Sequence, residues 1–387
     1  MTSRTRLFVL AISTPVIVFA LIGGYLGRAG AQGDDTFRHL RVFEDVVSLV
    51  LTNYVEPVDV RRAMRGAMKG LTDGLDPDSA YLTPDLVRSV ESNVSAGPAE
   101  VGLDLTRQYY LRVVSARDGS PAARAGLRPG DFVRAIDNRP TRNMSAYEGA
   151  RLLRGAPDSK VSLLVIRGSA ADPHVVELVR EALTAADTPS RMADADTGYI
   201  RIAEFSKDSA ATVKQALEAL AKSGATRYVV DLRGTARGDL DDGIAAARLF
   251  VQGGTLAVRL RRGDQRDAIT HQDGDGVITA PTVLLVDQGT AGAAEVFAAA
   301  LENNGRADLI GQKTMGRAAR QRLVKLPDES GLWLTYVRYL TPDGDPIHET
   351  GLEPDVDVEL LELEFGAAPP APDATLQKAL GHLRKAA

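Results

Sequence analysis

The spacing of hydrophobic and polar positions changes along the chain of 387 residues. In residues 36–94, apolar side chains such as Leu40 and Phe43 recur every three or four positions, which predicts amphipathic helices. From about residue 97 to 181, short apolar runs alternate with glycine and proline turns, which is typical of a compact β-rich unit. Further on, apolar strands alternate with helical patterns, and this order favours a layered α/β core.

The first 31 residues have the organisation of an export signal. Arg4 and Arg6 precede an apolar run from Leu7 to Leu26, and Ala29-Gly30-Ala31 resembles a cleavage site. The apolar run is also about as long as the ~20 residues of a membrane-spanning helix. We therefore expect either an anchor at the periplasmic face of the inner membrane or, after cleavage, a periplasmic or secreted protein.

Composition and charge exclude several classes of function. A net charge of -5 gives no reason to expect nucleic-acid binding. The absence of cysteine from the sequence excludes disulfides, thiolate catalysis and zinc–thiolate sites. The histidines stand far apart without metal-ligand spacing, so we expect no metal site and no cofactor. They are His39, His174, His271, His348 and His382.

The β-rich unit resembles the PDZ domains of bacterial proteases. The resemblance rests on the run Ser-Pro-Ala-Ala…Ala-Gly-Leu-Arg-Pro-Gly-Asp at 120–131, which an apolar strand follows. PDZ domains bind an extended C-terminus by strand addition and hold its carboxylate in a backbone nest. The resemblance implies a nest at Pro98 to Leu103, whereas a PDZ shell that serves only as a spacer is the alternative. It assigns peptide binding to Gly102, Leu103, Leu105, Ala150 and Leu153.

A turn of small residues at 288–295 has the frame of a serine-protease nucleophile turn but contains no serine. It follows the apolar run Thr282 to Val286, which predicts a buried strand, and it precedes a helical run from Glu295 to Glu302. Small residues let a backbone approach a substrate, and the amides of a helix N-terminus can hold an oxyanion. The scaffold for acyl transfer is therefore expected without the attacking atom.

The order of motifs resembles the carboxyl-terminal processing peptidases, the tail-specific serine proteases. This resemblance implies an α/β fold: a layered core like that of crotonase and ClpP, an inserted PDZ β-domain and an N-terminal helical segment. The motifs that carry it are Asn53–Pro57, Leu75–Pro77, the PDZ block, Gly198–Ile202, Val230–Arg233, Gly289–Glu295, Gly305-Arg306, Gly311–Gly316, Arg338–Gly344 and Gly351–Asp355.

Five segments are predicted: a signal or anchor at 1–31, a helical segment at 32–94, a PDZ domain at 95–183, a peptidase-like core at 184–362, and a linker with a C-terminal helix at 363–387. The helical segment fits either a dimerisation element or packing on its own domain. The C-terminal helix fits either docking on the core or a solvated tail.

The family's catalytic pattern is altered in this chain. Members use a serine in a motif like G-S-A-S-A-S-E, and the position of its attacking second serine is Gly292 here. The lysine base of a motif like T-F-G-K-G-S-V-Q corresponds to Arg317, and the glutamine that orients it is retained as Gln321. Glycine has no side chain to attack a carbonyl. Arginine stays protonated where a buried lysine can lose its proton.

The oxyanion region departs as well. Members usually place Pro-Gly-Gly after the Asp-Leu-Arg strand, whereas this chain has Ala236-Arg237-Gly238. By resemblance, the oxyanion donors are the amides of Gly238 and Ala293. Arginine at a glycine position threatens any backbone conformation of positive φ, and we expect its side chain to reach into the cleft.

Two displaced residues are fallback candidates for catalysis, namely Thr290 as nucleophile and Lys313 as base. Ser330 and His348 have no partner at short spacing and are expected to be surface residues. Arg317 fits either a clamp for the carboxylate of a bound tail or a side chain that drifted once catalysis was lost.

The sequence thus favours an exported pseudoprotease that captures the C-termini of envelope proteins through its PDZ domain, as a scaffold or regulator. Its expected partners include a second copy or an active paralogue, and the membrane through the N-terminal segment. The alternative is an active serine-type endopeptidase that cleaves envelope proteins near their C-termini. Whether it is an enzyme stays open at this point.

Overall fold

A computed structural model describes residues 37–92, 96–168, 172–184, 187–359, 363–367 and 371–385. The expected signal or anchor at 1–31 lies outside these residues. The chain divides into two compact units, Met1–Met68 and Lys69–Ala387, and each is described by itself.

The first unit contains a helix over residues 37–53 and the beginning of α2 (Val60–Asp73). The helical prediction for this segment is confirmed. Several of its apolar side chains are exposed, among them Phe37, Leu40, Val46, Leu49 and Tyr54. Within the described part of the chain, no helix combines the length and the apolar character that crossing a membrane requires.

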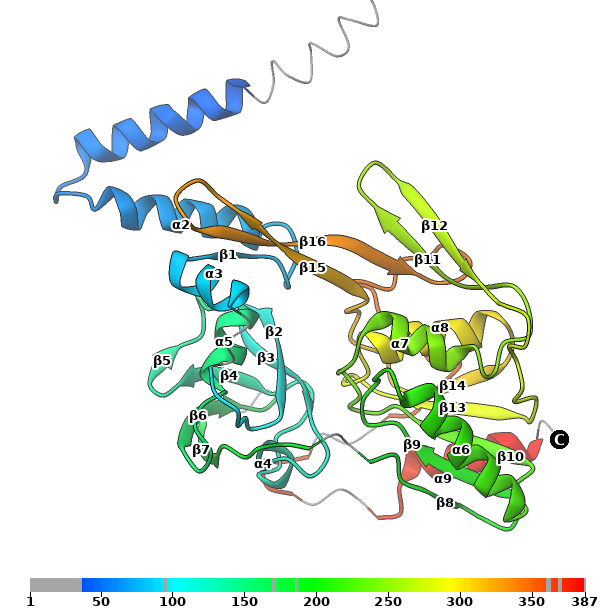
Figure 1. Ribbon diagram of the computed structural model, residues 1–387. Coiled ribbons are helices and arrows are strands. Elements are labelled where there is room, and N and C mark those ends of the chain that lie inside the picture. The colour runs from blue at the N-terminus through cyan, green and yellow to red at the C-terminus, as the bar shows by residue number, and fades with distance from the viewer. Residues whose placement is uncertain are drawn as a thin grey trace, which may run out of the picture. The chain divides into compact units, whose positions relative to one another are not determined.

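The second unit contains a mostly parallel sheet (Figure 1). Only β8 at its edge runs antiparallel to its neighbour β9. The strands lie in the order β17 (Val356–Asp357), β14 (Ala307–Gly311), β13 (Thr282–Val286), β10 (Arg227–Asp231), β9 (Thr197–Arg201) and β8 (Ser190–Met192).

Helices cover both faces of this sheet. The central strand β13 is buried along its length, and its side chains alternate between two cores: Leu284 and Val286 on one face, Val283 and Leu285 on the other. The first core also contains α6 (Ser209–Lys222), α7 (Leu240–Ala247) and α8 (Ala293–Asn303). The second contains α9 (Ala374–Lys385), so the C-terminal helix docks on the core rather than forming a solvated tail.

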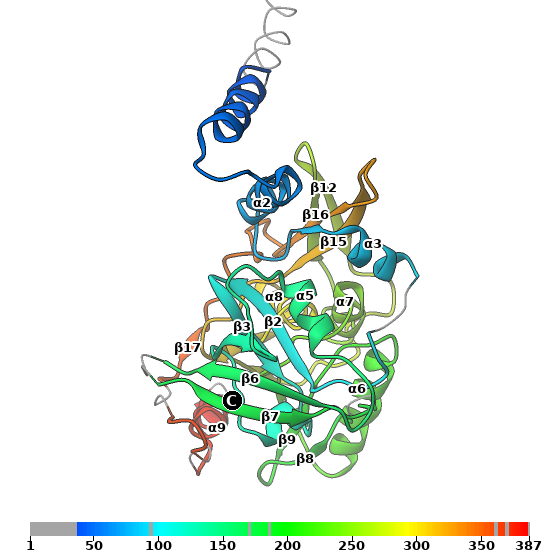
Figure 2. The same cartoon turned by 90° about the vertical axis from the view of Figure 1, so that its left-hand side faces the viewer.

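The PDZ-like unit is an antiparallel sheet with its own core (Figure 2). Ser145 caps α5 with its hydroxyl, and Glu148 closes the capping box. The elements are β2 (Leu103–Gln108), β3 (Tyr110–Ala116), α4 (Pro121–Arg124), β4 (Phe132–Ile136), β5 (Arg139–Pro140), α5 (Ala146–Leu152), β6 (Lys160–Ile166) and β7 (His174–Val179). The expected α/β core with an inserted PDZ β-domain is confirmed.

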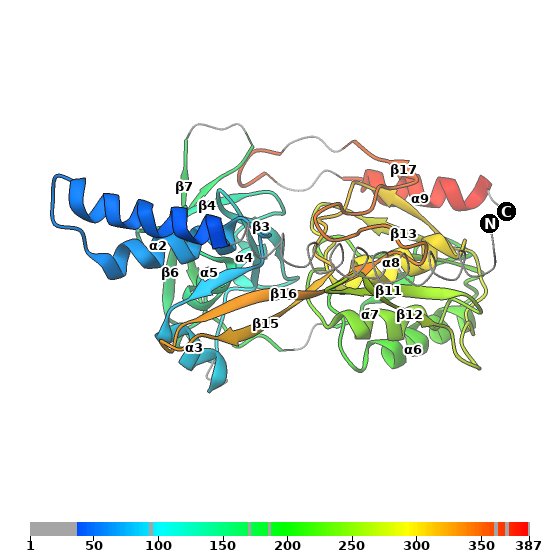
Figure 3. The same cartoon turned by 90° about the horizontal axis from the view of Figure 1, so that it is seen from above.

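A third, antiparallel sheet was not predicted. Its long strand β16 (Gly331–Leu340) pairs with β15 (Ala319–Lys325), and Figure 3 shows these two strands side by side. The remaining elements of this region are β1 (Ala80–Leu82), α3 (Pro84–Glu91), β11 (Thr255–Arg261) and β12 (Gln265–Thr270). Because β1 pairs with β16, which also pairs with β15, the turn before β1 lies near Gln321 of β15 and near Arg317 in the loop before β15.

Candidate active site and peptide groove

The turn between β13 and α8 holds Gly292 at the N-cap of the helix, with φ 62° and ψ −117°. This conformation favours glycine, and a side chain there would be strained. A Cβ built on Gly292 would nevertheless lie 3.7 Å from the carbonyl oxygen of Ala236 and 4.0 Å from that of Arg317. The expected oxyanion and base loops therefore both border the nucleophile position, which has room for a side chain that the sequence does not supply.

Glu295 ties this turn to the base loop. Its buried carboxylate accepts hydrogen bonds from the amides of Gly292 at 2.9 Å and Arg317 at 2.7 Å. It also accepts from Gly316 N and Thr314 Oγ1, each at 2.5 Å. Burial raises the pKa of the Glu295 carboxyl, and the four donors oppose this by stabilising the ionised form. The sequence signal for this role is a glutamate at the third position of a helix, where capping-box residues stand.

Arg317 is paired with an acid that sequence reasoning missed. Its Nη2 lies 2.9 Å from Asp78 Oδ1, and its Nε lies 3.4 Å from Asp78 Oδ2. The Asp78 side chain is only 7% exposed. Burial alone would lower the pKa of Arg317, but the Asp78 carboxylate outweighs it, so the pKa lies above its usual value. The guanidinium is thus a fixed cation.

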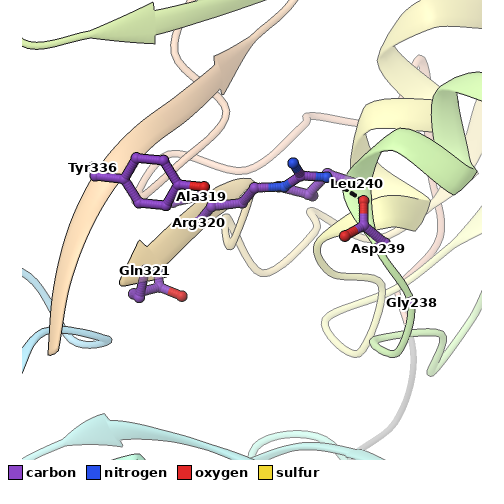
Figure 4. Close-up of a pocket in the computed structure, with 7 residues that line it drawn as sticks. All are labelled: Gly238, Asp239, Leu240, Ala319, Arg320, Gln321 and Tyr336. Atoms are coloured by element: carbon purple, nitrogen blue, oxygen red, sulfur yellow. Dashed lines mark hydrogen bonds and ion pairs between the residues drawn. The ribbon is translucent and has the colours of Figure 1, made fainter. Parts of the chain in front are cut away.

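Gln321 lines a polar cavity of about 360 Å³ between β15 and the start of α7 (Figure 4). Its Nε2 donates to Thr335 Oγ1 at 3.2 Å. Of the hydrogen bonds found in the described ranges, none joins Gln321 to Arg317. Arg320 crosses the same cavity to pair with Asp239.

The oxyanion region keeps its backbone form. Gly238 has φ 127°, and a Cβ there would lie 2.4 Å from the carbonyl oxygen of Phe205, so only glycine fits. In the part of the chain that the structure describes, the amides of Gly238 and Ala293 have no hydrogen-bond partner. Both remain available to an incoming oxygen.

Arg237 does not strain this loop, because positive φ falls on Gly238 instead. Its side chain reaches the PDZ-like unit, where Nη1 lies 2.7 Å from Glu100 Oε1 and Nε lies 2.9 Å from Asp104 Oδ2. It lines the cavity between these acids and Arg317, whereas the sequence led us to expect it inside the catalytic cleft.

Residues assigned to peptide binding surround two cavities that share Arg317. Gly102 and Leu153 line the first, of about 340 Å³, together with Arg237 and Gly238 of the core. Leu105 lines the second, of about 200 Å³. Leu103, Asp104 and Ala150 line both. The predicted peptide groove therefore opens onto Arg317, which stands at the position aligned with the family's base.

Gly102 is fixed by packing. It has φ 75°, and a Cβ would lie 2.3 Å from the Cβ of Ser120. This glycine therefore sets the shape of the predicted carboxylate nest.

The fallback residues are not brought together. Thr290 is buried, its hydroxyl donates to the carbonyl oxygen of Leu232 at 3.0 Å, and it accepts from the amide of Asp287. Lys313 forms a surface ion pair with Glu353 at 2.5 Å. Both side chains serve local structure.

The expectation that Ser330 and His348 are surface residues is wrong. Ser330 is 0% exposed because the turn between β15 and β16 folds its hydroxyl onto Asp328 at 2.5 Å. His348 is 3% exposed in the loop after β16, next to the loop of Gly316. Over the described ranges, no cluster of three or more histidine, aspartate or glutamate side chains is arranged to hold a metal ion.

Comparisons with known proteins agree with this architecture. Residues 196–358 match Peptidase family S41, and residues 112–167 match a PDZ domain. The chain is 30% identical over 370 residues to the carboxy-terminal processing protease CtpA of Bacillus subtilis, covering 93% of this chain and 78% of that protein. It is 32% identical over 356 residues to the carboxyl-terminal-processing protease of Synechocystis sp., covering 90% of this chain and 82% of that protein.

A solved structure gives the same result. The photosystem II D1 C-terminal processing protease superposes with a TM-score of 0.70 at 30% identity, covering 81% of this chain and 85% of that chain. Because the sequence similarity extends over nine tenths of its length or more, the chain belongs to the family of the carboxyl-terminal processing proteases, peptidase family S41.

Proposed function

We propose that this protein captures the C-terminal tails of other proteins through its PDZ groove and does not cleave them. One observation carries the proposal: the positions of nucleophile and base are occupied by Gly292 and by the ion-paired Arg317. Loss of an active nucleophile costs on the order of a million-fold in turnover. A guanidinium with a carboxylate partner cannot serve as the base, because it holds its proton at neutral pH.

The binding parts of the site support capture without turnover. The groove residues Leu103, Leu105, Ala150 and Leu153 line cavities of about 340 Å³ and 200 Å³ beside β2 and α5, which supports the binding of a tail there. PDZ domains recognise a free carboxylate with backbone amides. Gly102 keeps the positive φ on which such a nest depends.

Partners and location belong to the same proposal. The export-type N-terminus supports clients in the cell envelope and attachment to the membrane. The exposed apolar side chains on residues 37–53 support association with a second copy or with an active paralogue, since such surfaces mark interaction sites. In this arrangement the protein acts as a scaffold or regulator.

A second function, that of an active serine-type endopeptidase, is favoured by the names of the relatives, which are processing proteases. Purified protein incubated with unfolded and tail-tagged substrates distinguishes the two. We expect no cleavage by mass spectrometry. Cleavage that Thr290→Ala or Lys313→Ala abolishes would establish the second function instead.

Tail capture is tested by binding. Peptides with apolar C-termini should bind the protein and lose affinity when the carboxylate is amidated, because an amide removes the charge that the nest holds. Fluorescence anisotropy of labelled peptide pairs measures this. Equal binding of acid and amide would exclude carboxylate recognition.

A further inference from the structure

Arg317 lies among three carboxylates. Those of Asp78, Asp104 and Glu295 all raise its pKa against the effect of burial. Two of them are committed to other donors: Asp104 to Arg237 at 2.9 Å, and Glu295 to the four donors of the turn and the base loop. Asp78 is different, because its carboxylate contacts the guanidinium directly with both oxygens.

The backbone holds Asp78 in place independently of Arg317. Asp76 Oδ1 accepts hydrogen bonds from the amides of Asp78 at 2.9 Å and Ser79 at 2.7 Å. Ser79 Oγ donates to Asp76 Oδ2 at 2.8 Å, and β1 begins at the next residue. Because the turn is fixed in this way, the carboxylate of Asp78 is presented to position 317 by the fold.

We infer that Asp78 is a positioning residue of this site: its fixed carboxylate orients the guanidinium of Arg317 and would keep a lysine at the same position charged. The inference rests on the proposed function and deepens it. A lysine base needs a free lone pair, and a carboxylate at ion-pair distance favours the ammonium form instead. Exchanging Arg317 for lysine therefore does not restore a base while Asp78 remains.

Other titratable groups also face this pair. They are Asp76 and His348 beside Asp78, Asp104 from β2, Glu295 from α8, and Arg237, which lines the same cavity as Arg317. Burial lowers the pKa of His348, so it is neutral at pH 7 and adds no charge. Asp104 is the matched control, since it is a nearby carboxylate whose hydrogen bonds go to Arg237 and Ser115.

The experiment follows the titration of a lysine introduced at position 317. Full-length Arg317→Lys protein is prepared with 13C-labelled lysine, and the signal of the introduced lysine is assigned by its absence from the wild type. We expect Asp78→Asn in this background to lower the titration midpoint by at least one pH unit, and Asp104→Asn to lower it by less. An unchanged midpoint in the double variant of Arg317→Lys with Asp78→Asn, or an equal shift from Asp104→Asn, would overturn the inference.

Folding is checked by circular dichroism, and Asp78→Ser replaces Asp78→Asn if the latter does not fold. The two proposals fail separately. Cleavage of peptides by the wild type would contradict the proposed function and leave the midpoints of the introduced lysine unaffected. Equal titration midpoints with and without Asp78→Asn would contradict the role of Asp78 but would not affect the proposal of tail binding.

Discussion

The peptide groove and the catalytic cleft share Arg317 but differ in what they retain. In the groove, a Cβ added at Gly102 would lie 2.3 Å from the Cβ of Ser120, so only glycine fits, and apolar side chains line the space that a tail would fill. In the cleft, Gly238 and Gly292 keep the positive φ of the turn backbone, and the positions that align with the family's nucleophile and base carry Gly292 and Arg317. The comparison teaches that the two parts of a site depend on different features: backbone conformation and packing set the shape for recognition, whereas individual side chains supply the reacting groups.

The largest expected effect is on stability, from Glu295→Gln. The substitution replaces one carboxylate oxygen by an NH2 group, which cannot accept the hydrogen bonds of the surrounding donors. We therefore expect the free energy of unfolding to fall by about 3 kcal/mol or more. Urea denaturation measures this. As a control, Glu353→Gln loses only a surface ion pair with Lys313 and should cost less than about 1 kcal/mol. An equal loss of stability in the two variants would contradict the role of Glu295 in holding the turn and the base loop together.

The second prediction concerns the groove. In Gly102→Ala the new methyl group clashes with Ser120, so the backbone of the nest must shift. We expect the affinity for a tail peptide to fall about tenfold or more, which corresponds to ~1.4 kcal/mol of binding free energy. Gly119→Ala is the matched control, since Gly119 has φ 71° but no atom within 4 Å of the added carbon. Fluorescence anisotropy should show unchanged affinity in the control. Loss in both variants would point to general strain rather than to the nest.

The third prediction concerns the contact between groove and cleft. Burial would raise the pKa of Glu100, but the hydrogen bond and charge of Arg237 outweigh it and hold this pKa below its usual value. The stabilisation is therefore present above the unfolded glutamate pKa of about 4.3 and is lost as the pH falls below it. Wild type should lose more stability on acidification through this range than Arg237→Ala does.

Thermal unfolding at a series of pH values measures this difference. Arg154→Ala serves as the control, because Arg154 also pairs with Glu100 but is about half exposed, at 43%. It should leave most of the acid dependence in place. If the stabilities of wild type and Arg237→Ala fall in parallel as the pH is lowered, the ion pair between Arg237 and Glu100 does not stabilise the contact between groove and cleft.

The smallest expected effect is that of Gly292→Ser. The side chain has room, and the positive φ should cost about 1 kcal/mol of stability. We expect no cleavage of a fluorogenic tail peptide, alone or with Arg317→Lys, because no neutral base is present. Turnover above the wild-type background in Gly292→Ser alone would show that the cleft lacks only the hydroxyl. Turnover only in the double variant would show that a lysine at position 317 acts as a base despite Asp78.

The frame of the site could be predicted from the sequence because its signals are local. An apolar run, a turn of small residues and an apolar helical run lie next to one another, and the structure forms β13, Gly292 and α8 there. The capped helix α5 is similar, because Ser145 and Glu148 stand at capping-box spacing. Short-range patterns of this kind are independent of the rest of the fold.

The partners of the site could not be predicted, because they come from distant segments. Asp78 and Arg317 are 239 residues apart, and nothing in either neighbourhood marks the pair. The burial of His348 and Ser330 likewise follows from how loops fold over each other. Strand β12 escaped detection because Gln265–Thr270 is polar and mostly exposed, without the alternation that marks a half-buried strand.

The two free amides at Gly238 and Ala293 have a kinetic consequence under the proposed function. A peptide carbonyl that enters the cleft can be polarised there but not attacked, so a captured partner leaves in the form in which it arrived. The lifetime of such a complex is then set by the dissociation rate alone, with no competing turnover. A variant that lowers the affinity of the groove for the tail would therefore shorten the residence time of the complex.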